Sequence, residues 1–221
     1  ASAVGMSILE KNGNAFDAAV ATGFALQVVE PHLNGPGGEV PLILCPNEES
    51  PIVICGQGVA PNSATLKTFS DMNLNIVPGS GLLPAVVPGA FDAWMLLLHN
   101  YGTMSLRTVL EPAISIATKG YPLVPNIINT IKSVEELFKT EWTSSAEIYL
   151  PKGVLPSIGD FFTNKNMAKT YLRIIDEAEN KSKDREEQIK HARLIWSQGF
   201  VAQEIEDFCK NNEFMDTTEK R

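Results

Sequence analysis

The strongest pattern near the start of the chain is a nearly all-apolar segment with helical periodicity. Asn14 is placed to cap a helix, and Asp17 follows three residues later as a short form of the capping box. Pro31 ends the segment, because a proline inside a helix removes a backbone donor. The spacing predicts a helix over Asn14–Glu30 that close neighbours surround, since alanines fill much of the rest of it. Its large apolar side chains recur every four residues: Phe16, Val20, Phe24 and Val28.

A hairpin is expected next, formed by two runs that are apolar along their length. We expect strands at Glu39–Cys45 and Pro51–Cys55, joined by the polar turn Pro46–Ser50. Because neither run alternates between apolar and polar residues, we expect both faces of this hairpin to be covered. A short helix at Ala1–Lys11 precedes these elements, and a loop at Gly56–Pro61 follows them.

The rest of the chain has mainly helical periodicity. We expect an irregular but well-packed connection at Ile76–Pro88, which is rich in glycine and proline, and a loop at Thr140–Ile158. This order differs from the strand–helix alternation of a doubly wound sheet. It favours an α+β fold in which helices cover a largely antiparallel sheet, most of whose strands lie outside this chain. The further helices are expected at Pro88–Tyr101, Ser105–Gly120, Pro125–Phe138, Asn164–Ala178 and Arg185–Asn211.

Composition and charge narrow the class of protein. Of the 221 residues, 44% are hydrophobic and 20% are charged, which is enough apolar material for a core and too little charge for a disordered chain. The formal net charge of -8 disfavours nucleic acid as a partner. No apolar run has the length that a membrane span needs. The chain opens inside a helix and ends on the charged stretch Asp216–Arg221, so we expect a piece of a longer protein, whose compartment stays open.

The residue types that usually carry chemistry form no recognisable site of their own. The three cysteines make no disulfide framework; Cys45 and Cys55 could face each other across the hairpin, but free buried thiols are favoured. The histidines lack the spacing of metal ligands, and we expect His99 and His191 at exposed helical positions. The loop from Gly56 to Pro61 lacks the third glycine and the βαβ unit of a dinucleotide fingerprint. We therefore expect no metal and no cofactor, and among the histidines only His32, beside a glycine-rich turn, merits a test. The residues considered are Cys45, Cys55, Cys209, His32, His99 and His191.

Two features beside the predicted hairpin have a plausible role in binding. The turn Asn34–Gly38 is dense in glycine, which either supplies positive φ between a helix and a strand or forms an anion-binding nest of successive amides. Gln57 is flanked by two glycines at the end of a buried strand, which places its amide within reach of a cleft; a plain loop glutamine is the alternative. Ser80 lacks the surroundings of a nucleophile elbow. The residues alone therefore contain no complete catalytic set.

Several segments match those of a known family, in the same order. The run from Gly5 to Ala21 resembles the opening G-x-x-I-L-x-x-G-G-N-A-x-D-A-A-V-A of that family. The run Val28–Pro31 followed by Gly35–Gly38 resembles its segment V-x-E-P…G-x-G-G. The family comprises the γ-glutamyltransferases and related acylases, which are N-terminal-nucleophile hydrolases. Further positions in register are Pro88, Gly89, Tyr101, Gly102, Pro112, Ala113, Ala117, Gly120, Gly199 and Ile205.

The resemblance implies a four-layer αββα sandwich, of which residues 1–221 are an incomplete domain, the N-terminal part of a large subunit. It implies a precursor that cuts itself and a small subunit whose N-terminal threonine is the nucleophile, with its own amine as base. That threonine lies outside this chain, since Thr217 and Thr218 precede the expected processing point, and no catalytic residue is assigned here. The implied partners are a small γ-glutamyl or related acyl amide and the missing C-terminal part or small subunit.

One departure from the family pattern concerns Gln57. The resemblance implies that glutathione-acting members carry an arginine in a D-F-R-E-x-A-P-like segment, where it clamps the α-carboxylate of the γ-glutamyl group. Gln57 takes that place within Cys55–Pro61, and a neutral amide should bind a carboxylate more weakly than a charged fork by about 1.5–3 kcal/mol. We therefore expect an amide hydrolase or acyltransferase of the acylase-like branch, with Gln57 lining the acyl pocket. The alternatives are a catalytically silent relative that binds or scaffolds and a true glutathione hydrolase.

Overall fold

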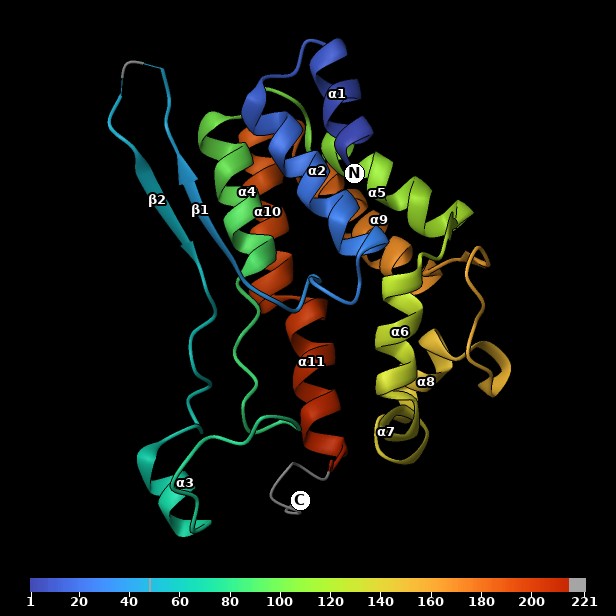
Figure 1. The fold of residues 1–221 in the computed structure, drawn as a ribbon. Coiled ribbons are helices and arrows are strands. Elements are labelled where there is room, and N and C mark those ends of the chain that lie inside the picture. Colours follow the sequence, from blue (N-terminus) through green and yellow to red (C-terminus); the bar gives the residue numbers. More distant parts are fainter. Residues whose placement is uncertain (48, 215–221) are drawn as a thin grey trace.

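The computed structural model describes residues 1–47 and 49–214 as a bundle of helices with a β-hairpin along one side (Figure 1). Two very short strands, β3 and β4, form a separate antiparallel pair. The elements are α1 (Ser2–Glu10), α2 (Ala15–Val29), β1 (Val40–Leu44), β2 (Ile52–Gly56), α3 (Leu66–Asp71), α4 (Ala90–Tyr101), α5 (Leu106–Lys119), β3 (Tyr121–Pro122), α6 (Pro125–Ser133), α7 (Glu135–Thr140), α8 (Thr143–Tyr149), the 3-10 turn η1 (Pro151–Gly153), β4 (Phe161–Phe162), α9 (Lys165–Lys181), α10 (Arg185–Gln198) and α11 (Phe200–Asn211).

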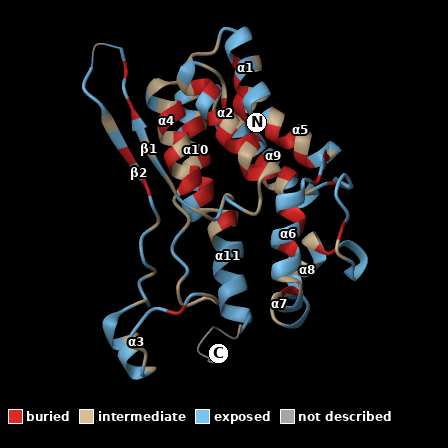
Figure 2. Ribbon diagram, in the orientation of Figure 1, coloured by how far each residue is buried: buried red, intermediate tan, exposed pale blue. Residues whose placement is uncertain are grey.

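Helix α2 begins where the sequence pattern places it. The side-chain oxygen of Asn14 accepts hydrogen bonds from the backbone N–H groups of Phe16 and Asp17, each at 2.9 Å. The Asp17 carboxylate accepts the N–H of Asn14 at 2.9 Å, so the predicted capping box is confirmed. Helices α1, α4 and α5 pack around α2 and leave it buried on most sides (Figure 2). At Gly23 the approach is so close that a Cβ would lie 2.5 Å from the ring of Trp94.

Asp17 also joins α2 to a distant part of the chain. Its fully buried carboxylate accepts the backbone N–H groups of Thr103 at 2.9 Å and Met104 at 3.0 Å, and the Thr103 hydroxyl at 2.8 Å. Burial by itself would raise the pKa of the Asp17 carboxyl, but the hydrogen bonds from Met104, Asn14 and Thr103 outweigh burial and lower that pKa. The start of α2 is therefore fastened to the connection between α4 and α5.

Helix α4 packs against α10, and α5 packs against α9. Buried residues concentrate where these helices meet (Figure 2). The Phe24 ring makes edge-to-face contacts with Phe91 and Tyr171, and Phe91 stacks on Trp196 at 4.5 Å between ring centroids. The buried Tyr171 hydroxyl donates to the side-chain oxygen of Gln27 at 2.6 Å. This bond places a satisfied polar pair inside an otherwise apolar core.

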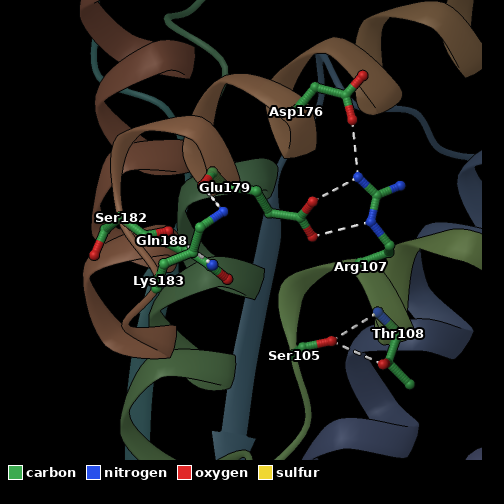
Figure 3. Close-up of polar contacts among 8 residues, drawn as sticks. All are labelled: Ser105, Arg107, Thr108, Asp176, Glu179, Ser182, Lys183 and Gln188. Carbon is green, nitrogen blue, oxygen red and sulfur yellow. Dashed lines mark hydrogen bonds and ion pairs between the residues drawn. The ribbon is translucent and has the colours of Figure 1, made fainter.

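Charged side chains tie the same helices together at the rim of the bundle. Figure 3 shows Arg107 of α5 donating from Nε and Nη2 to the two carboxylate oxygens of Glu179 in α9, at 2.9 and 2.7 Å. Nη2 also donates to Asp176 at 2.8 Å, and the bonds to these two carboxylates raise the pKa of the guanidinium. Arg193 of α10 makes a similar two-point contact with Asp92 of α4, at 2.6 and 3.0 Å.

The predicted hairpin is confirmed, but its surroundings differ from the prediction. Strands β1 and β2 pair antiparallel, with Ile43 opposite Val53 and Pro41 opposite Cys55. One face of the hairpin packs against α4. On the other face Ile43 is 80% exposed and Val53 is 66% exposed. The prediction of two covered faces is therefore wrong within the described residues, because a single layer of helices from this chain lies against the hairpin.

Three predicted segments differ from the structure in their internal breaks. The helix expected at Pro125–Phe138 divides into α6 and α7 at Val134, where no glycine or proline marks the break. The helix expected at Arg185–Asn211 divides into α10 and α11 at Gly199, which has extended backbone angles. The loop expected at Thr140–Ile158 contains α8 and η1.

The sequence pattern missed α3 and overestimated the packing beside it. Helix α3 begins at Thr65, whose hydroxyl accepts the N–H of Thr68 at 3.1 Å, and none of its residues is buried, so no apolar stripe announces it. The segment Ile76–Pro88 contains no helix or strand, as predicted. Its dense packing is not observed, since Ile76 is 78% exposed and Val77 is 54% exposed.

Some expectations fall on the end of the chain. Thr217, Thr218 and the charged stretch Asp216–Arg221 lie outside the described residues. Among the helices of the described part, none has both the length and the apolar character that crossing a bilayer requires.

Candidate functional site

Gln57 lies directly after the last residue of β2, at the end of the exposed face of the hairpin. Its side chain is exposed. Val53, Cys55 and Gln57 are all exposed, while Ile54 and Gly56 are buried, as expected for alternating residues of a strand that runs on by one position. The structure therefore presents the Gln57 side chain on the side of the hairpin that faces away from α4.

The backbone around Gln57 is held tightly by its two neighbouring glycines. A Cβ at Gly56 would lie 2.1 Å from the carbonyl oxygen of Val40, and a Cβ at Gly58 would lie 2.0 Å from the carbonyl oxygen of Val87. Only glycine permits contacts this close, so both positions are fixed by backbone packing. The N–H of Val87 donates to the carbonyl of Val59 at 2.9 Å and continues this pairing.

Gly89 brings the Gln57 loop together with the glycine-rich turn. A Cβ at Gly89 would lie 2.6 Å from the carbonyl oxygen of Gly56 and 2.9 Å from the carbonyl carbon of Gln57. The N–H groups of Gly89 and Ala90 both donate to the carbonyl oxygen of Gly38, at 3.2 and 3.1 Å. The turn at Gly38 and the loop at Gly56 thus meet Gly89 at the start of α4, and the loop presents the Gln57 side chain.

The glycine-rich turn acts differently from the prediction. The prediction of positive φ at Asn34–Gly38 is wrong, because the described glycines with positive φ are Gly81, Gly120, Gly153 and Gly159. The turn instead closes through the N–H of Gly38, which donates to the carbonyl of Gly35 at 3.1 Å. An added Cβ would meet nothing within 4 Å at Gly35 or Gly37, so close backbone approach does not require glycine at these two positions, and the anion-binding alternative stays a prediction.

Two expectations for the other candidate side chains are overturned. His99 is half-buried, against the exposed position expected for it, and its Nδ1 contacts the side-chain oxygen of Asn100 at 2.7 Å. The prediction of buried thiols is wrong, since all three cysteines are free and exposed. Cys45 and Cys55 do not face each other, because Cys55 pairs with Pro41. Within the described residues, no group of three or more His, Cys, Asp or Glu side chains is arranged to hold a metal ion.

Cys55 is the one neighbour of Gln57 that the sequence pattern did not connect to it. The Cys55 thiol donates to the Gln57 side-chain oxygen, with 3.7 Å between Sγ and Oε1. Residues two apart on a strand share a face, so the strand assignment contained the signal for this contact. The candidate site is therefore a fixed backbone loop that presents the paired side chains of Cys55 and Gln57.

This combination of helices and hairpin is the mixed helix-and-sheet fold of solved γ-glutamyltranspeptidase structures. The chain belongs to the γ-glutamyltranspeptidase family, whose model, described as Gamma-glutamyltranspeptidase, matches residues 1–214. The family predicted from the sequence motifs is thereby confirmed.

Individual relatives agree with this assignment. The chain is 34% identical to the glutathione hydrolase-like YwrD proenzyme of Bacillus subtilis (strain 168) over 215 residues, which cover 96% of this chain and 38% of the relative. It is similar in structure to LmbA2991HD, with a TM-score of 0.96 and 48% identity over 100% of this chain and 38% of that one. The γ-glutamyltranspeptidase of Helicobacter pylori aligns with a TM-score of 0.82 and 32% identity over 96% of this chain and 57% of that one. The chain thus spans well under half the length of the curated relative.

Proposed function

We propose that residues 1–221 are the N-terminal part of a large subunit in a longer proenzyme. The chain covers 38% of the YwrD proenzyme, which supports this division. The exposed face of the hairpin supports it too, since the apolar side chains of Ile43 and Val53 lie on this face and are 80% and 66% exposed. In a four-layer αββα sandwich a second sheet packs on this face, and the helices around α4 form the outer layer on the other.

The proposed activity is hydrolysis or transfer of the acyl group of a small γ-glutamyl or related acyl amide. A threonine at the start of the small subunit, outside this chain, attacks the amide carbonyl, and its own amine accepts the proton. The amine leaving group departs from the tetrahedral intermediate, and water or an acceptor amine then takes the acyl group from the threonine ester. The observation that carries this proposal is the family match over residues 1–214, with Gln57 presented at the open face of the hairpin.

Gln57 has the proposed role of lining the acyl pocket. The rigid loop between Gly56 and Gly58 presents its amide at a fixed place, which is what recognition of one acyl group requires. The neutral Gln57 amide lacks the positive charge with which an arginine at this position would bind a carboxylate. We therefore assign the protein to the acylase-like branch of the family. The chain is 36% identical over 145 residues to the acylase ACY 1 proenzyme of Pseudomonas sp. (strain SE83), covering 59% of this chain and 25% of that proenzyme.

The test uses the full-length processed protein with two anilides, one of γ-glutamate and one of glutarate. We expect turnover of the glutaryl anilide with a higher kcat/KM than that of the γ-glutamyl anilide. Gln57→Arg should raise kcat/KM for the γ-glutamyl anilide about tenfold or more, because a charge-assisted pair with the α-carboxylate adds about 1.5–3 kcal/mol. No turnover of either anilide by a correctly processed protein refutes the proposed activity.

A glutathione hydrolase is the second candidate, because the glutathione hydrolase proenzyme of Bacillus subtilis (strain 168) is 34% identical over 179 residues. In that case a carboxylate clamp comes from outside the Gln57 loop. The γ-glutamyl anilide would then be the better substrate of the unmodified protein, and Gln57→Arg would leave its KM unchanged. A catalytically silent binding protein would process neither anilide and lack the downstream threonine.

A further inference from the structure

Cys55 and Gln57 form a pair on the open face of the hairpin. Both side chains are exposed, and they point to the same side because they are two residues apart on an extended strand. The contact between Cys55 Sγ and Gln57 Oε1, at 3.7 Å, joins a weak donor to a carbonyl-type acceptor. The backbone between them lies in close contact with β1 and α4, because a Cβ at Gly56 would lie 2.1 Å from the Val40 carbonyl oxygen and 2.6 Å from the Ala93 Cβ. The rotation of the Gln57 side chain is therefore the main freedom left at this position.

We infer that Cys55 is a positioning residue that orients the Gln57 amide within the acyl pocket, an inference that rests on the proposed function. The thiol can donate to Oε1 in the observed orientation, and this leaves Nε2 directed away from Cys55. Nε2 carries two N–H donors and no acceptor. The pocket wall built by this chain thus offers the substrate a neutral hydrogen-bond donor.

This orientation defines the class of acyl group that the site selects. The far end of the acyl chain carries a hydrogen-bond acceptor, such as a carboxamide or carboxyl oxygen, and an apolar end of the same shape leaves the donor unsatisfied. Without the thiol, the Gln57 amide rotates freely and presents its oxygen as often as its nitrogen, which weakens the selection of acyl groups that end in an acceptor. Cys55→Ser retains a hydroxyl donor and should preserve this selection.

The experiment compares two anilides on the full-length processed protein, one of glutaramic acid and one of 5-methylhexanoic acid. These acyl groups have the same shape, and only the first ends in a carboxamide. We expect the ratio of their kcat/KM values to favour the carboxamide by about tenfold, the size of one hydrogen bond to a neutral donor. Cys55→Ala should lower this ratio severalfold through the KM of the carboxamide substrate alone, with kcat unchanged. Cys55→Ser should restore the ratio, and Gln57→Ala should remove the preference altogether.

Cys45→Ala is the matched control, since Cys45 is also an exposed thiol of the hairpin but donates to the backbone carbonyl of Glu49. It should leave the ratio unchanged. If the unmodified protein hydrolyses both anilides and Cys55→Ala leaves the ratio unchanged, the inference is overturned while the proposed activity stands. If the unmodified protein hydrolyses neither anilide, the proposed activity is refuted, and the inference that rests on it is overturned as well.

Discussion

Asp17 is the buried charge on which the packing of α2 most depends, and its replacement is the sharpest test of the fold. Asp17→Asn keeps the size of the side chain but replaces one acceptor oxygen with an NH₂ group. In the native protein the carboxylate accepts three backbone N–H groups and one hydroxyl, from Asn14, Thr103 and Met104, at 2.8–3.0 Å. Bonds to a charged acceptor contribute about 1.5–3 kcal/mol each, and Asn loses about half of them while avoiding the desolvation of a charge. We expect the free energy of unfolding to fall by about 2–3 kcal/mol.

The assay is urea unfolding of the full-length protein, followed by tryptophan fluorescence and by hydrogen exchange of α2. The pKa of Asp17 is lowered in the folded state, so its stabilisation is complete above the unfolded value of about 3.9 and is lost as pH falls through the lower folded value. The difference between native and variant should therefore stay constant from neutral pH to about pH 5 and shrink in stronger acid. Asp71→Asn is the control, because the exposed Asp71–Lys67 pair should contribute at most about 1 kcal/mol. Equal effects of the two variants would refute the reasoning.

Two further predictions concern the core and the loop. Tyr171→Phe should lower the free energy of unfolding by about 1–3 kcal/mol, because it leaves the buried oxygen of Gln27 without its donor at 2.6 Å. The double variant with Gln27→Met should recover most of that loss in urea unfolding, and a loss equal to the sum of the single variants would contradict the pairing. Gly56→Ala should both destabilise the protein and lower kcat/KM, since its Cβ would lie 2.1 Å from the Val40 carbonyl and displace Gln57. Gly79→Ala is its control, because nothing lies within 4 Å of the added methyl group, and equal turnover by both variants would show that the Gly56 contact does not hold Gln57.

Elements with strong local signals were predicted well. The capping residues Asn14 and Ser105 bond to the N–H groups expected of them, and Gly120, with a φ of 90°, ends α5 where its position indicated. The family motifs also predicted the family correctly. Local patterns also failed for identifiable reasons: α3 has no buried face to create a periodic signal, and the break at Val134 has no local breaker.

The sequence pattern did not predict the long-range contacts. Asp17 looked like an ordinary capping residue, because its bonds to Thr103 and Met104 join positions separated by 86 and 87 residues. Cys45 and Cys55 looked like buried thiols, because an apolar strand does not reveal which of its two faces is exposed.

The sequence by itself determined the family and the capped central helix. These depend on residue identity and on spacing within a few turns of chain, which a linear pattern contains. Tertiary structure decided that Gly38, Gly56 and Gly89 meet at the start of α4, and that Cys55 and Gln57 share the open face of the hairpin. Close packing of distant backbone segments creates these relations, and no local propensity encodes it.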